Sequence, residues 1–182
     1  MQESIIIAGA GGQGIMLLGR ILAEAAMEGG REVSWLPSYG AEVRGGTASC
    51  MVVISDKEIG SPFIDKADTL IIMNEPSLAK FKDRIKNKGL LIVNSSLVES
   101  EIACNNIRVL RCAFTDIAIK LGNIKVANMV ALGCYAAETK LIAPDKVIAV
   151  MEHIAPQDKK HLVEINKQAL YQGMELIKNV KG

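Results

Sequence analysis

The chain has 182 residues, of which 49% are hydrophobic and only 4% are aromatic, and its formal net charge is +1. This length suits one globular domain with an aliphatic core, and we predict a single domain over residues 1–182. The charges are balanced and scattered, which argues against nucleic acid as a ligand, and no apolar run approaches the about 18 residues of a membrane span.

Strand and helix patterns alternate along the chain. Helical spacing begins at Gln13 and stops at Gly29, and a further helix is predicted at 76–88, ending before Gly89. Thr115 is the expected N-cap of the next helix. The pattern predicts a three-layer α/β/α domain with a mostly parallel sheet and a helical C-terminal part. Predicted strands cover 4–10, 32–36, 47–55, 67–74, 89–96 and 106–112, and later helices cover 115–122, 125–140, 144–154 and about 158–178.

A glycine-rich loop joins the first predicted strand to the first helix. Gly9, Gly11 and Gly14 form G-x-G-x-x-G, a context suited to a phosphate at a helix N-terminus. A dinucleotide site also needs an acidic residue at the end of the second strand, where residues 35–37 are apolar, so NAD is disfavoured. Three alternatives stay open: the glycines only make a tight turn, they bind another phosphate-bearing ligand, or their amides meet another protein's backbone.

The tip of this loop holds Gly12 and Gln13. We expect the Gln13 amide to be exposed, where it adds nothing to strand packing but can exchange hydrogen bonds with a group outside the domain. Gly12 and Gln13 are therefore candidate binding residues together with the three motif glycines.

A second glycine-bounded loop follows the second predicted strand. It carries Tyr39, Glu42 and Arg44, with Gly45 and Gly46 after them. A guanidinium offers a planar fork to a carboxylate or phosphate, although the glutamate and the arginine can also simply pair with each other. Since both loops follow parallel strands, we expect them at the same carboxyl edge of the sheet, where open α/β sheets bind ligands.

The four cysteines predict no metal or cluster site. Cys50, Cys104, Cys112 and Cys134 stand far apart without a C-x-x-C pair, and two histidines are too few for a tetrahedral set. We interpret the cysteines as free thiols. The N-terminus does not have the pattern of a secretory leader, so we expect a cytoplasmic protein with no membrane span.

The chain resembles the gamma subunit of 2-oxoacid:ferredoxin oxidoreductases, particularly the 2-oxoglutarate type. The likeness extends over nearly the whole chain and includes the closing stretch KKHLVEINKQALYQGMEL. The loop form YGAEVRGGTA is similar to the 2-oxoglutarate branch rather than the pyruvate branch. The other motifs that carry the resemblance are IIIAGAGGQGIMLLGRILAEAA, WLPSYGAEVRGGTASCMVVIS with IGSP after it, and NMVALG.

This resemblance implies a part in the oxidative decarboxylation of 2-oxoglutarate to succinyl-CoA. In that family the whole enzyme uses thiamine diphosphate as its cofactor and passes electrons through iron–sulfur clusters to ferredoxin. Thiamine diphosphate, magnesium and the clusters are therefore expected on partner chains, namely thiamine-binding alpha and beta subunits and a ferredoxin-like delta subunit. The scattered cysteines agree with this division, because they lack cluster spacing.

Coenzyme A is the ligand that the resemblance implies for the two loops. A pyrophosphate suits amides at a helix N-terminus, as at 9–14, and a ribose phosphate suits an arginine, as Arg44 in loop 39–46, but which loop takes which phosphate stays open. Arg44 can equally hold a substrate carboxylate or a partner's carboxylate. No catalytic or metal-binding side chain is expected. The alternatives are a gamma-type subunit for pyruvate or indolepyruvate, an NAD(P)-binding oxidoreductase domain, and a subunit whose loops are only partner contacts.

Overall fold

The computed structural model describes residues 1–38, 46–102 and 106–181. Its sheet has the strand order β2-β3-β1-β4-β5-β6. β1, β4, β5 and β6 run parallel, whereas β3 is antiparallel to both β1 and β2. The sheet is therefore mixed, with one reversed strand. The strands are β1 (Gln2–Ala10), β2 (Glu32–Ser38), β3 (Thr47–Ser55), β4 (Ala67–Ile72), β5 (Ile85–Asn94) and β6 (Arg108–Cys112).

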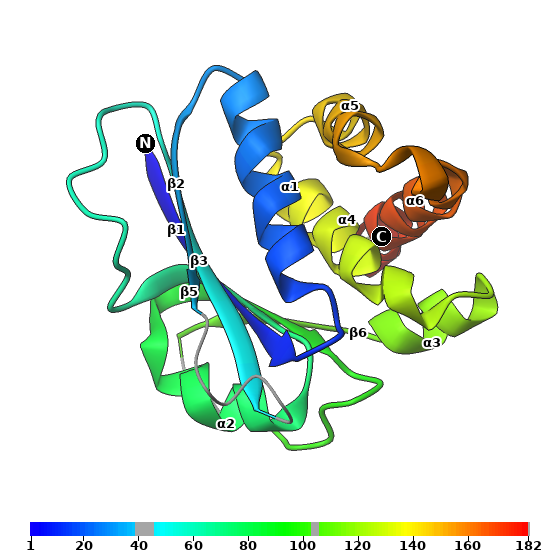
Figure 1. Ribbon diagram of the computed structural model, residues 1–182. Coiled ribbons are helices and arrows are strands. Elements are labelled where there is room, and N and C mark those ends of the chain that lie inside the picture. Colours follow the sequence, from blue (N-terminus) through cyan, green and yellow to red (C-terminus); the bar gives the residue numbers. More distant parts are fainter. Residues whose placement is uncertain (39–45, 103–105, 182) are drawn as a thin grey trace.

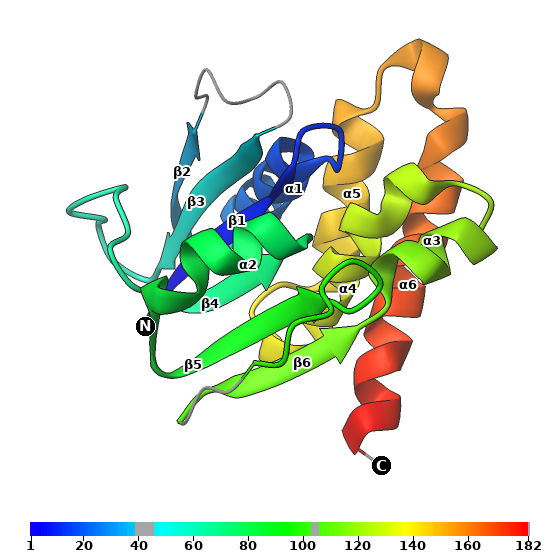
Figure 2. The same ribbon diagram turned by 90° about the horizontal axis from the view of Figure 1, so that it is seen from below.

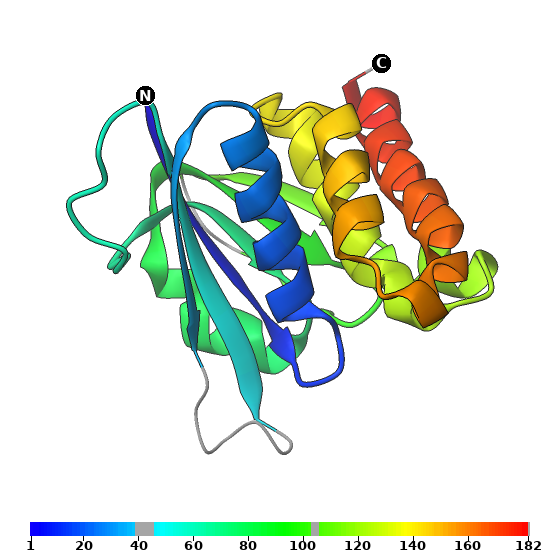
Figure 3. The same cartoon turned by 45° about the horizontal axis from the view of Figure 1, so that its top comes forward.

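Helices cover both faces of the sheet, which confirms the three-layer prediction. The helical layer on one face is thick, and Figure 3 shows α1, α5 and α6 side by side in it. The opposite face carries only α2 (Glu75–Phe81) among the described α-helices (Figures 1 and 2). The thick layer comprises α1 (Ile15–Glu28), α3 (Phe114–Lys120), α4 (Ala127–Thr139), α5 (Pro144–Ile154) and α6 (His161–Lys181), and short 3-10 turns are η2 (Lys82–Arg84), η3 (Ile124–Val126) and η4 (Gln157–Lys159). None of the helices in the described ranges has the length and hydropathy to span a membrane.

Side chains of the central strands alternate between two cores. Ile5 and Ile7 of β1 pack under the thick helical layer, whereas Ile6 and Ala8 pack toward α2. All four side chains are fully buried. Burial on both faces explains why this strand is a continuous apolar run in the sequence rather than an alternating one.

The predicted helix at 76–88 was wrong in its second half. α2 ends at Phe81, and β5 already begins at Ile85, which packs against the core on the α2 side. Lys88 has a φ of 64°, and a Cβ at Gly89 would lie 2.6 Å from the Ile85 Cγ1 atom. Helical periodicity does not reveal where the helix ends and the strand begins, because Ile85 continues the apolar spacing of the helix.

Thr115 is not the N-cap of α3, which is Ala113. Asn94, the last residue of β5, supplies the polar contacts instead. Its Oδ1 accepts a hydrogen bond from the Thr115 backbone N–H at 3.3 Å, and its Nδ2 donates to the Thr115 Oγ1 at 2.9 Å and to the Met73 carbonyl at 3.1 Å. One buried amide therefore ties the start of α3 to the ends of two parallel strands.

α4 and α6 pack with their backbones in direct contact. A Cβ at Gly133 would overlap the Leu170 carbonyl, and a Cβ at Gly173 would overlap the Val130 carbonyl. The Cys134 Sγ also donates to the Gly173 carbonyl at 3.1 Å. The small residues of α4 thus permit close helix packing.

Either Gly133→Ala or Gly173→Ala should destabilise the protein, because the added methyl group forces the two helices apart. We expect each to lower the free energy of unfolding by about 3 kcal/mol in urea titrations. Gly60→Ala is the matched control, since nothing lies within 4 Å of its Cβ position, and its effect should stay within about 0.5 kcal/mol. Equal effects at all three positions would contradict close packing of α4 on α6.

Candidate functional site

Strand register brings the flanks of the two predicted loops to one edge of the sheet. Ala10 of β1 pairs with Thr47 of β3, and Ser38 of β2 pairs with Ser49 of β3. β1 and β2 point the same way because both are antiparallel to β3. The expected common edge is thus confirmed for the residues that flank the loops.

Tyr39, Glu42, Arg44 and Gly45 lie outside the residues that the structure describes, so their roles stay predictions. Gly46 is described and half-buried, immediately before β3. The described residues on either side of 39–45 lie beside the first glycine loop.

The first loop turns from β1 into α1 through two glycines with positive φ, 90° at Gly12 and 69° at Gly14. Gly14 is the N-cap of α1, and no described side chain caps this helix. The first helical hydrogen bond runs from the Leu18 N–H to the Gly14 carbonyl at 2.9 Å. No described residue accepts a hydrogen bond from the N–H groups of residues 15–17, which lie at the positive end of the helix dipole and suit an anion.

A cavity of about 390 Å³ opens at this helix N-terminus. Ligand pockets commonly have volumes of roughly 300–1,000 Å³. No charged side chain of a described residue lines this cavity, and Leu17 stands 44% exposed at it. The cavity joins the glycine loop to the ends of β2 and β3. It is lined by Ala10, Gly11, Gly12, Gly14, Ile15, Met16, Leu17, Ser38 and Ala48.

Gln13 faces inward, so the expectation of an exposed, outward-bonding amide was wrong. Its Oε1 accepts from the Ala10 N–H at 2.7 Å, and its Nε2 donates to the Met73 carbonyl at 3.4 Å. The buried Gly9 is needed here, because a Cβ at this position would lie 2.6 Å from the Gln13 Oε1. The Met73 carbonyl is 60 positions away in sequence, which is why sequence reasoning missed it.

The inward-facing Gln13 amide is an argument against the alternative of a dinucleotide-binding site. β1 leads to α1 on one face of the sheet, and β4 leads to α2 on the other (Figure 1). Open α/β folds bind nucleotides in the crevice between two such strands. Gln13 bridges the ends of β1 and β4 at that place, which further disfavours an NAD site.

Cys50 lies beneath the start of α1 and is fully buried. Burial raises the pKa of this thiol to about 12, and the neighbouring Trp35 indole opposes this rise only in part. The Sγ is 3.7 Å from the Ile15 carbonyl, to which it donates. A neutral, buried thiol packs rather than reacts. The described cysteines, Cys50, Cys112 and Cys134, are all free and buried, as predicted.

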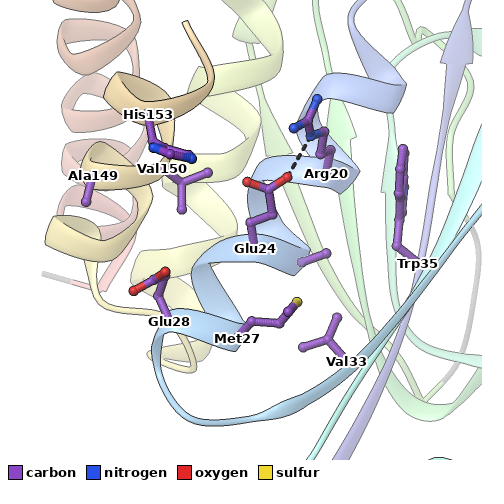
Figure 4. A pocket seen from close by; sticks show the side chains of 10 residues that line it. Arg20, Glu24, Met27, Glu28, Val33, Trp35, Ala149, Val150 and His153 are labelled. Atoms are coloured by element: carbon purple, nitrogen blue, oxygen red, sulfur yellow. Dashed lines mark hydrogen bonds and ion pairs between the residues drawn. The ribbon is translucent and has the colours of Figure 1, made fainter.

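A larger cavity, of about 680 Å³, lies along the C-terminal half of α1, between β2 and α5 (Figure 4). The Arg20 Nε donates to the Glu24 Oε1 at 2.6 Å, so these two charges offset each other. None of the predicted site residues that the structure describes lines this cavity. Within the described ranges, no three His, Cys, Asp or Glu side chains gather as a metal site would require.

Asn128, the second residue of α4, contacts the glycine loop, although the sequence analysis did not predict it as a site residue. Its Nδ2 donates to the Gly14 carbonyl at 3.2 Å. The side chain is only 2% exposed. The two residues are 114 positions apart, so neither spacing nor periodicity could indicate the contact.

Fold and site together define an α/β domain whose glycine loop presents an uncapped helix N-terminus to a cavity. The model of the pyruvate ferredoxin/flavodoxin oxidoreductase family matches residues 4–176. The chain therefore belongs to this family, which confirms the family recognised from the sequence motifs.

Two relatives and one solved structure illustrate this membership. 2-Oxoglutarate synthase subunit KorC of Methanothermobacter marburgensis is 36% identical over 184 residues, covering 97% of each chain. Ketoisovalerate oxidoreductase subunit VorA of Methanothermobacter thermautotrophicus is 35% identical, but the chain spans only 37% of that relative's length. The 2-oxoglutarate:ferredoxin oxidoreductase from Magnetococcus marinus, solved with 2-oxoglutarate, coenzyme A and succinyl-CoA bound, has the same fold, with a TM-score of 0.89 at 23% identity, covering 98% of this chain and 31% of that one.

The two hydrogen bonds of Gln13 predict unequal effects of its substitutions. Gln13→Ala leaves the Ala10 N–H without its acceptor and should lower the free energy of unfolding by about 2 kcal/mol. Gln13→Glu keeps an acceptor for that N–H, and when its carboxyl is protonated it can also donate to the Met73 carbonyl, so its cost should be smaller at low pH. Urea unfolding of both variants at low pH measures the difference. A cost for Glu that equals or exceeds that for Ala under these conditions would contradict the inward geometry.

Proposed function

We propose that the chain is the gamma-type subunit of a 2-oxoglutarate:ferredoxin oxidoreductase. The observation that carries this proposal is the match to 2-oxoglutarate synthase subunit KorC, at 36% identity over 97% of both chains. The complex oxidises and decarboxylates 2-oxoglutarate, transfers the acyl group to coenzyme A to form succinyl-CoA, and reduces a ferredoxin-like acceptor. Thiamine diphosphate, magnesium and the iron–sulfur clusters belong to the partner subunits.

The two kinds of relative support a role beside another polypeptide. The same domain accounts for 97% of KorC but for 37% of the longer VorA chain. A domain that occurs both alone and within a longer chain works next to the remainder of that chain. This favours assembly with the thiamine-binding subunits over activity of the isolated chain.

Coenzyme A is the ligand that we propose for the cavity at the α1 N-terminus. The N–H groups of residues 15–17 suit one of its phosphate groups, and the glycines let the ligand approach the backbone closely. Arg44, carried on the neighbouring loop, is proposed for a second phosphate. The Magnetococcus marinus structure holds coenzyme A in a protein of the same fold, which supports this choice of ligand.

Native purification tests the assembly and the substrate together. We expect co-purification with a thiamine-binding pair and a ferredoxin-like chain, identified by mass spectrometry. Reduction of ferredoxin should be fastest with 2-oxoglutarate in a panel that also contains pyruvate, ketoisovalerate and indolepyruvate. A preference for another 2-oxoacid would reassign the substrate. A lone oligomer that binds NADH saturably would overturn the proposal.

Leu17→Glu tests the cavity directly. Residue 17 is exposed in the first turn of α1, so a carboxylate there competes with an anionic ligand for the free N–H groups and repels it. In the assembled complex we expect the KM for coenzyme A to rise about tenfold, with an unchanged KM for 2-oxoglutarate. Leu17→Gln is the neutral control of the same size and should change the KM for coenzyme A much less. Equal effects of Glu and Gln would argue against an anionic ligand.

Arg44→Ala tests the second loop. We expect turnover to fall while the complex stays assembled, because the bidentate contact to a phosphate is lost. Arg44→Lys should restore only part of the activity, since an ammonium group lacks the planar fork. Size-exclusion chromatography and the KM for coenzyme A are the measurements. Dissociation of the complex would identify Arg44 as an interface residue instead.

A further inference from the structure

Asn128 makes an incomplete set of hydrogen bonds in a buried position. Its Nδ2 donates to the Gly14 carbonyl, whereas its Oδ1 has no hydrogen-bond partner among the described residues. The orientation of the amide is fixed by chemistry, because only the NH₂ end can donate to a carbonyl. A buried acceptor without a partner costs free energy, so packing alone does not explain an asparagine at this position.

The hydrogen-bond partner of Asn128 is Gly14, the residue at which the loop enters α1. Gly14 has a φ of 69° and is the N-cap of α1. Its carbonyl accepts from both the Leu18 N–H at 2.9 Å and the Asn128 Nδ2 at 3.2 Å. A Cβ on Gly14 would overlap the Asn128 amide, so this contact is tight. Asn128 thus contacts the loop at Gly14, which lines the cavity, without lining the cavity itself.

We propose that Asn128 is a positioning residue for the ligand at the α1 N-terminus, an inference that rests on the proposed coenzyme A site. Glycine explores many backbone conformations when nothing restrains it. The Asn128 amide holds Gly14 in the one conformation that leaves the N–H groups of residues 15–17 facing the cavity. The ligand then binds a loop that is already ordered, which spares it the free-energy cost of ordering.

Asn128→Asp is the sharpest test, because it keeps the shape and removes the donor while the carboxyl is ionised. In the purified complex we expect the KM for coenzyme A to rise about tenfold, with kcat and the KM for 2-oxoglutarate changed less than about twofold. As the pH falls and the carboxyl is protonated, it donates to the Gly14 carbonyl again. The ratio of mutant to wild-type KM for coenzyme A should therefore decrease toward low pH. A purely structural residue would not produce this selective, pH-dependent ratio.

Asn128→Ser is the second variant, and it keeps a hydroxyl donor on a shorter side chain. We expect an intermediate KM for coenzyme A, and this variant provides the test if Asn128→Asp does not assemble. The inference is overturned if the variants lower stability or kcat while the KM for coenzyme A stays at the wild-type value.

Leu17→Glu distinguishes a failure of the proposed coenzyme A site from a failure of the positioning role of Asn128. If Leu17→Glu raises the KM for coenzyme A and the Asn128 variants do not, the site stands and the positioning role of Asn128 is wrong. If Leu17→Glu and the Asn128 variants all leave this KM unchanged, the proposed coenzyme A site itself is wrong.

Discussion

The pairing of β1 with strands of opposite direction on its two sides constrains the rest of the structure. β3 pairs with β1 antiparallel along its whole length, and β4 pairs with it parallel. β2 ends at the same edge of the sheet as β1, and the reversed β3 begins there. The described residues that flank the two glycine-bounded segments therefore come together at this edge, and the cavity at the start of α1 lies between them.

The sequence predicted what depends on local pattern. β-Branched runs located the buried strands, and the glycine motif located the turn into α1. The contacts that it missed at polar side chains share one cause, which is a partner distant in sequence. Gln13 turns inward toward Met73, Asn94 takes the place of a local cap at Thr115, and Asn128 reaches Gly14. In each case a side-chain amide satisfies a backbone group on another element, and neither propensity nor periodicity carries information about such a contact.

Contacts of this kind also explain why the chain has a dinucleotide-binding fingerprint although its structure does not favour binding of a dinucleotide. G-x-G-x-x-G records the need for a tight turn and for close packing of β1 against its neighbours, and these needs are met at Gly9 and Gly14. It does not record what fills the crevice between β1 and β4. The Gln13 amide bridges that crevice, so the accessible surface of the loop shifts to the cavity beside β2 and β3. An anionic group remains a suitable ligand, but a nucleotide laid across the strand ends does not.

The packing of α4 links the stability of the domain to this cavity. Gly133 brings α4 against the α6 backbone, and Asn128, near the beginning of the same helix, contacts the Gly14 carbonyl. A short helix fixed at one point by backbone contact and at another by a buried amide has little freedom to shift. The position of the α1 N-terminus is therefore set by α4 as well as by β1. Close helix packing remote from the cavity thus contributes to the geometry that a ligand meets there.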